Sequence, residues 1–160
     1  MKKIFTAIFI LFLLTLLVGC AVTGSALTTA AYKGQTNVVK DLLDKGADVN
    51  ERSGCGLGSD PNLTALICAV TDGHIETVKV LVARGADVNV TYQNGWTPLA
   101  YVAYKGNAGI AKLLIEKGAD IDTAMAQLEK YRSADGIKFL ERIAKNQQPS
   151  RQTETMASQA

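Results

Sequence analysis

The chain has 160 residues, 48% of them apolar, with 17 basic and 15 acidic side chains. This length suits one small domain. Lys2 and Lys3 are the only charged residues before position 20, so the rest of the chain has 15 side chains of each sign. That neutral balance argues against a nucleic-acid binder. The single histidine, His74, and the three cysteines exclude a histidine-pair mechanism and a four-ligand zinc site built from cysteines alone.

Residues 1–19 have the pattern of a secretory signal peptide. After the two lysines, an uncharged and mostly apolar run covers 4–18, which is shorter than the about 20 residues that span a bilayer. The run ends Leu17-Val18-Gly19-Cys20, which resembles the lipobox of bacterial lipoproteins. The resemblance implies cleavage before Cys20, diacylglycerol on its sulfur and a fatty acid such as palmitate on its amine. Residues 20–24 are then a short tether between this membrane anchor and the domain.

The residue after Cys20 is Ala21 rather than aspartate. By resemblance to the sorting rules of enteric bacteria, this favours the outer membrane over the inner one. We therefore expect a lipid-anchored protein of the bacterial cell envelope that faces the periplasm.

Three segments of the chain, 25–50, 64–89 and 97–122, align without gaps. Each closes with a Gly-Ala-Asp triplet, and the triplets begin at 46, 85 and 118. In each segment, two stretches with helical spacing of apolar residues flank a turn glycine (Gly34, Gly73 and Gly106). One such unit cannot bury its apolar stripe alone, but stacked units can, so the pattern predicts an all-α repeat domain.

These segments resemble the ankyrin repeat, through Thr97-Pro98-Leu99, Gly73-His74 and the closing Gly-Ala-Asp-Val-Asn sequences. The resemblance covers about 25–122 and implies a solenoid of helix-turn-helix units joined by short finger hairpins. In the third unit Asn107 stands where the family often has a histidine, so we expect fewer capping hydrogen bonds there.

The chain after the third unit lacks a finger sequence. Residues 123–132 and 135–145 are predicted to be the first and second helices of a degenerate fourth unit, which caps the stack over 123–145. The repeat domain then spans 25–145. Residues 146–160 are rich in Gln, Ser and Thr without an apolar stripe, which predicts a disordered polar tail.

No motif for catalysis, metal binding or cofactor binding is recognisable. The glycine-rich run 54–60 lacks the Gly-Lys-Ser/Thr ending of a phosphate loop, and His74-Ile75-Glu76 is not accompanied by the Cys-x-x-Cys of zinc deaminases. We therefore expect no enzymatic activity, no metal and no cofactor. Two interpretations of Cys55 and Cys68 stay open: a disulfide, as an oxidising compartment allows, or a buried free thiol at Cys68.

The resemblance to ankyrin repeats implies that a partner binds the finger tips and the concave face of the first helices. The family positions give the candidate residues Tyr32, Lys33, Thr71, Asp72, Tyr92, Gln93, Asn94, Trp96, Tyr104, Lys105, Lys130 and Tyr131. Tyrosine and tryptophan are the residue types that anchor protein interfaces, although Trp96 has the alternative of folding back onto the second unit. Tyr101 falls at a core position and is left out.

The hypothesis that follows is a non-enzymatic lipoprotein that binds another protein, with a mildly acidic surface, in the cell envelope. A first alternative is an immunity protein that neutralises a periplasmic toxin. A second alternative is a structural factor that contacts peptidoglycan or lipid.

Overall fold

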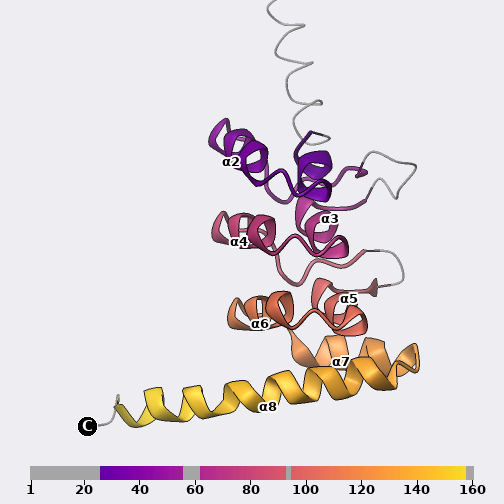
Figure 1. Ribbon diagram of the computed structural model, residues 1–160, viewed down its shortest axis with the longest axis vertical. Helices are drawn as coiled ribbons and strands as arrows, with labels where there is room; N and C mark the ends of the chain where they lie inside the picture. The colour runs from indigo at the N-terminus through magenta and orange to yellow at the C-terminus, as the bar shows by residue number, and fades with distance from the viewer. Residues whose placement is uncertain (1–25, 56–61, 93–94, 158–160) are drawn as a thin grey trace, which may run out of the picture.

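The computed structural model describes residues 26–55, 62–92 and 95–157, with side chains as far as 146. The predicted signal peptide, Cys20 and its tether lie outside the described residues, as do Gln93 and Asn94. A helix at residues 26–32 precedes α2 (Thr36–Asp44), α3 (Ala65–Thr71) precedes α4 (Ile75–Ala83), and α5 (Pro98–Lys105) precedes α6 (Ala108–Glu116). These helix pairs lie one beneath another (Figure 1), as the repeats predicted.

The first helices begin where a threonine can cap them. Thr64 and Thr97 are extended, and their hydroxyl oxygens accept hydrogen bonds from the backbone amides of Ile67 (3.4 Å) and Ala100 (3.3 Å). Pro98 occupies the first turn of α5, where the missing amide hydrogen costs no helical bond. Local sequence thus fixes the start of α3 and of α5.

The predicted stripes of the second helices form the core. Val39, Val78, Leu81 and Leu114 are fully buried. Leu42, which has no repeat above it among the described residues, is only partly buried. The first helices contribute small buried side chains, namely Ala30, Ala31, Ala69, Val70, Val102 and Ala103, so that neighbouring units approach closely.

Polar contacts repeat from unit to unit. Asn50 accepts a hydrogen bond from the backbone amide of Asp87 (2.8 Å) and donates one to the carbonyl of Gly85 (3.2 Å). Asn89 makes the same pair of bonds to Asp120 (2.8 Å) and Gly118 (3.1 Å), one unit further. The closing asparagines of the first and second units therefore fix the register of the units that follow them.

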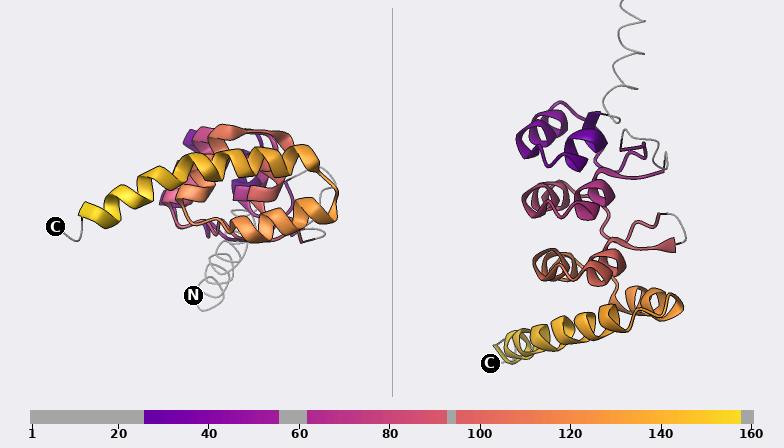
Figure 2. Two further views of the ribbon diagram at one scale, coloured as in Figure 1. Left: turned by 90° about the horizontal axis from the view of Figure 1, so that it is seen from below. Right: turned by 45° about the vertical axis from the view of Figure 1, so that its right-hand side comes forward.

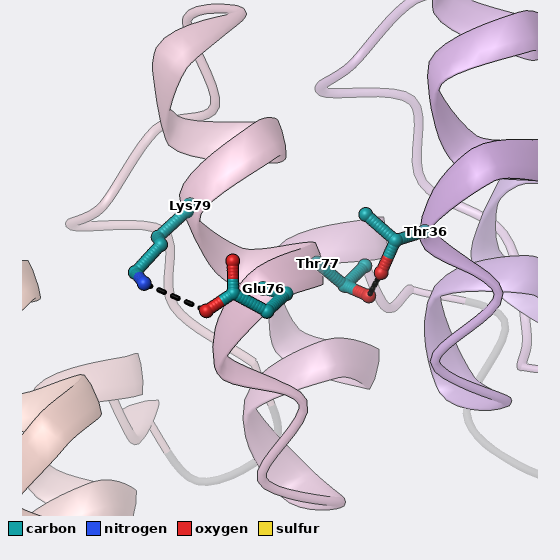
Figure 3. Close-up of polar contacts among 4 residues, drawn as sticks. All are labelled: Thr36, Glu76, Thr77 and Lys79. Atoms are coloured by element: carbon teal, nitrogen blue, oxygen red, sulfur yellow. Dashed lines mark hydrogen bonds and ion pairs between the residues drawn. The ribbon is translucent and has the colours of Figure 1, made fainter.

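The second helices also meet through hydroxyl groups. The Oγ1 atoms of Thr36 in α2 and Thr77 in α4 lie 2.8 Å apart, whereas Lys79 and Glu76 form an exposed ion pair within α4 (Figure 3). Thr77 is buried, so its hydroxyl needs this partner. The exposed pair contributes little to stability, because solvent screens it.

Asn107 contradicts the expectation of weaker capping in the third unit. Its side chain accepts a hydrogen bond from the Ile110 amide (3.2 Å) and so caps α6. The corresponding His74 makes no capping bond to α4; its Nε2 atom lies 2.9 Å from the carbonyl oxygen of Tyr32. The expectation was wrong because asparagine is itself among the best N-cap residues, even where the family often has histidine.

The finger segments contain no β-strand among the described residues. Isolated backbone bonds close them instead. The Ser53 amide donates to the carbonyl of Leu63 (2.9 Å) in the first finger; in the second, the Tyr92 amide donates to the carbonyl of Trp96 (3.1 Å) and the Gly95 amide to that of Tyr92 (2.9 Å). A disulfide joins Cys55 of the first finger to Cys68 of α3, with the Cα atoms 6.3 Å apart. It attaches the long first finger to the second unit.

The C-terminal cap has a different arrangement from the one predicted. Its helices are α7 (Ile121–Lys130) and α8 (Ala134–Ala157). α7 lies on the side that carries the finger segments, and α8 crosses beneath the stack (Figure 2). α8 packs against both α5 and α6, whereas α7 packs against α5 and α8. Thus α7 occupies the place of a third finger, and α8 covers both columns of helices by itself.

Close packing holds α8 in this place. A Cβ atom on Gly136 would lie 2.8 Å from Cδ2 of Leu128 in α7 and 3.5 Å from the Cα atom of Tyr104 in α5. Leu140 and Ile143 of the same helix are buried. The absence of a side chain at Gly136 therefore lets three helices meet.

The predicted disordered tail from 146 differs from the structure, in which α8 continues to Ala157. Residues 146–157 contain several good helix formers, including Gln147, Gln148, Arg151 and Met156, but also Pro149, which removes one helical hydrogen bond. The helix formers favour extension of a helix that packing has already nucleated, whereas Pro149 opposes it. Among the described residues, no helix has both the length and the apolar character needed to cross a bilayer.

Candidate functional site

Three aromatic side chains from separate segments meet at the C-terminal end of the stack. The ring of Trp96 lies 5.8 Å from that of Tyr104 in α5, edge to face, and 5.0 Å from that of Tyr131 at the end of α7. Tyr104 and Tyr131 are 58% and 42% exposed, whereas Trp96 is half-buried. We call Trp96, Tyr104 and Tyr131 the aromatic cluster. Trp96 therefore packs on the third unit and the cap rather than on the second unit.

Hydrogen bonds from α7 position the segment that carries Trp96. The side-chain oxygen of Gln127 accepts bonds from the backbone amide (3.0 Å) and the hydroxyl (3.2 Å) of Thr97, and its amide group donates to the carbonyl of Gly95. The turn that includes Trp96 is thus attached to α7. Aromatic groups held in this way lose little conformational entropy on binding, which favours affinity.

A second aromatic pair flanks the cluster. The rings of Tyr92 and Tyr101 lie 6.3 Å apart, edge to face, and the Lys105 ammonium lies 5.6 Å from the centre of the Tyr101 ring. The sequence assigned Tyr101 to the core, but it is only half-buried. Its place on this surface was missed because the apolar spacing of a helix this short does not separate a core position from its edge.

Tyr92 is less accessible than a fingertip position suggests. Its hydroxyl oxygen is buried and has no hydrogen-bond partner among the described residues. Burial of the phenol is the main cause that raises the pKa of Tyr92 above its ordinary value, and the nearby Tyr101 raises it further. Tyr92 thus supports the finger more than it offers a contact to a partner.

The other predicted residues divide between the two ends of the stack. Lys105 and Lys130 lie beside the aromatic cluster, with the Lys130 ammonium 5.8 Å from the centre of the Tyr131 ring. Tyr32, Lys33, Thr71 and Asp72 end the first helices of the first two units. Tyr32 is half-buried, and the Thr71 hydroxyl donates to the Cys68 carbonyl (2.8 Å). The structure therefore concentrates the exposed aromatic rings at the C-terminal end.

An open depression of about 420 Å³ adjoins the aromatic cluster between α5 and α8. It is lined by Ala103, Tyr104, Lys105, Gly106, Asp135, Lys138, Phe139 and Arg142. Neither Phe139 nor Arg142 is among the residues that the sequence predicted for partner binding. Phe139 and Arg142 are spaced by one helical turn, and this pairing of an aromatic with a basic residue could have indicated the site from the sequence.

Within the residues that the structure describes, no three His, Cys, Asp or Glu side chains gather where they could hold a metal ion. His74 has a structural place, because its ring joins the second unit to the Tyr32 carbonyl of the first.

Comparison with known proteins identifies the repeats. A family model for ankyrin repeats (3 copies) matches residues 53–125, and a second model for ankyrin repeats (many copies) matches 27–71. Together they cover the three units predicted from the sequence. No curated protein matches the chain.

Proposed function

We propose that this chain is a lipid-anchored protein of the bacterial cell envelope that binds a partner protein. Its ankyrin repeats, in an all-α fold, are a protein-interaction module. Its binding surface is the one formed by the finger segments and the ends of the first helices. We propose further that it acts by binding alone, without catalysis.

The aromatic cluster is the observation that carries this proposal. The ring centres of two exposed tyrosines, Tyr104 and Tyr131, each lie within 6 Å of the ring centre of Trp96. Solvent exposure of such rings costs free energy that a partner recovers by covering them. Tyrosine and tryptophan at the centre of a surface patch are typical hot spots of protein interfaces.

The lipid anchor is supported by the leader sequence and by the cysteines. Residues 1–19 end in Leu17-Val18-Gly19 before Cys20, as a lipobox does. The disulfide between Cys55 and Cys68 agrees with an oxidising compartment outside the cytoplasm. Two or three acyl chains on Cys20 would hold the protein stably on the membrane.

Photo-crosslinking in the native host tests partner binding. In one variant, a crosslinking amino acid replaces the exposed Tyr104. In the control variant, it replaces Glu116, which is exposed on α6, the second helix of the third unit. We expect one protein to be captured from position 104 and not from position 116, and its identity separates a toxin from an assembly factor. Identical adducts at both positions, or only lipid and cell wall at position 104, would contradict the proposal.

Metabolic labelling tests the anchor independently. Cells given labelled palmitate should incorporate it into the wild-type chain, and the Cys20→Ala variant should lose the label and leave the membrane fraction. Cys55 and Cys68 pair with each other in the structure, so substituting both gives a control that keeps the label. Equal labelling of the Cys20→Ala variant would refute the lipobox interpretation.

A further inference from the structure

The depression between α5 and α8 has more positive charge than its surroundings. Of its charged lining residues, Lys105, Lys138 and Arg142 are basic and only Asp135 is acidic. None of these four forms an ion pair with another residue in the described ranges 26–55, 62–92 and 95–146. This local excess is unusual on a chain whose charges balance beyond residue 20.

Aromatic rings orient the basic groups. The Arg142 guanidinium lies 5.8 Å from the centre of the Phe139 ring, and the Lys105 ammonium lies 5.6 Å from the centre of the Tyr101 ring. Such cation–π contacts place a positive charge without neutralising it. The two groups therefore remain available to an anion that enters the depression.

Tyr104 connects the depression to the aromatic cluster. It lines the depression, and its ring also packs edge to face on Trp96. A segment of a partner that covers the cluster would therefore reach the basic residues without leaving the surface. The two features form one continuous contact area, apolar at Trp96 and cationic at Arg142.

We infer that this depression receives aspartate or glutamate side chains from an extended acidic segment of the partner protein, an inference that rests on the proposed function. Carboxylates match the three basic groups in charge, and Phe139 and Tyr104 accommodate the aliphatic or aromatic residues between them. The lining residues belong to the region of α5 and α8, and α8 lies at the opposite end of the stack from α2 (Figure 1). Under the proposed anchoring at Cys20, we expect this end to meet a periplasmic protein rather than lipid headgroups.

Fluorescence anisotropy tests this inference with a short synthetic peptide of alternating glutamate and tyrosine, and a twin in which glutamine replaces glutamate. The full chain in detergent micelles should bind the glutamate peptide about ten-fold more tightly than its twin. The double variant Lys138→Glu/Arg142→Glu should lose that ten-fold preference. The matched control Lys40→Glu/Lys117→Glu, with the same change in net charge on exposed second-helix positions, should keep it.

Several results would overturn the inference. These are equal affinity for the two peptides, an equal loss in both double variants, and displacement of the peptide by inorganic phosphate at the same concentration. Circular dichroism and the thermal midpoint show whether each variant is folded. Tyr131→Ala, which changes the cluster but not the lining of the depression, separates the two proposals. If it weakens both peptides while Lys138→Glu/Arg142→Glu affects neither, the binding surface stands and the acidic-segment site fails.

Discussion

Gln127 is the residue whose removal best tests the arrangement of the cap. In the structure its side chain makes three hydrogen bonds to the turn that carries Trp96: two from Thr97 and one to Gly95. Gln127→Ala removes all three, while alanine keeps or improves the helix propensity of α7. The substitution therefore affects the contact between α7 and the finger segment and little else.

The magnitude follows from the burial of Thr97, which is only 3% exposed. Each hydrogen bond contributes about 0.5–1.5 kcal/mol net, and an amide left buried without a partner costs about 1–3 kcal/mol. Gln127 is itself half-buried, so water replaces part of the loss. We expect Gln127→Ala to lower the free energy of unfolding by about 2 kcal/mol, which corresponds to about 4–8 °C in the thermal midpoint.

Two measurements on the same sample check this prediction. Thermal unfolding followed by circular dichroism gives the midpoint. Tryptophan emission reports on the turn alone, because Trp96 is the only tryptophan in the chain, and it should shift to longer wavelength as the ring becomes exposed. The matched control is Gln35→Ala at the start of α2, where the exposed glutamine makes no capping bond, and we expect a change within about 0.5 kcal/mol. Equal midpoints for the two variants, with unchanged emission, would refute the reasoning.

Three further perturbations have outcomes that the structure defines. Gly34→Ala should lower the thermal midpoint more than Gly106→Ala. Both glycines have positive φ, but only a Cβ atom on Gly34 would meet His74, at 2.5 Å from its Nδ1 atom. Equal thermal midpoints for the two variants would contradict this packing. Reducing the disulfide between the first finger and α3 should lower the free energy of unfolding by about 3 kcal/mol, measured by urea titration with and without reductant; coincident curves would show that the bond does not constrain the unfolded chain. The hydroxyl of Thr123 and, to a lesser extent, its backbone amide donate hydrogen bonds that hold the pKa of Asp120 below its ordinary 3.8. The contribution of Asp120 to the free energy of unfolding is therefore complete above pH 3.8 and is lost as the pH falls through the lower pKa of the folded state. An NMR titration in which the Asp120 carboxyl protonates at or above 3.8 would exclude this cap.

The repeated units of the fold could be predicted because the helical spacing within each unit agrees with the repetition of that spacing along the chain. The stripe that contains Val39, Val78 and Leu114 has helical spacing, and each second helix ends before a glycine that begins a Gly-Ala-Asp triplet. Repetition in three units excludes other interpretations of the same spacing. The family models cover these units and confirm the assignment.

The cap could not be predicted in the same way, because its helices lack a signal for their place in the stack. Residues 121–130 have the spacing of any amphipathic helix, and the bonds from Gln127 to Gly95 and Thr97 decide where that helix lies. Such contacts span about thirty residues of sequence and leave no periodic pattern. The same limit applies to the tail, where composition indicated disorder but α8 continues to Ala157.

Because α7 replaces a finger, the cap contributes both to the stability of the stack and to the proposed binding surface. A terminal repeat must cover the last apolar layer, and α8 does so by crossing beneath both α5 and α6. This leaves α7 free to bring Tyr131 against Trp96, and α8 to bring Phe139 and Arg142 beside Tyr104. The cap that closes the stack therefore also builds the aromatic and basic surface. It follows that Gln127→Ala should weaken partner capture from position 104 in proportion to the fraction of chains in which the Trp96 turn is released, whereas Gly34→Ala, at the opposite end, should reduce stability without selectively affecting that capture.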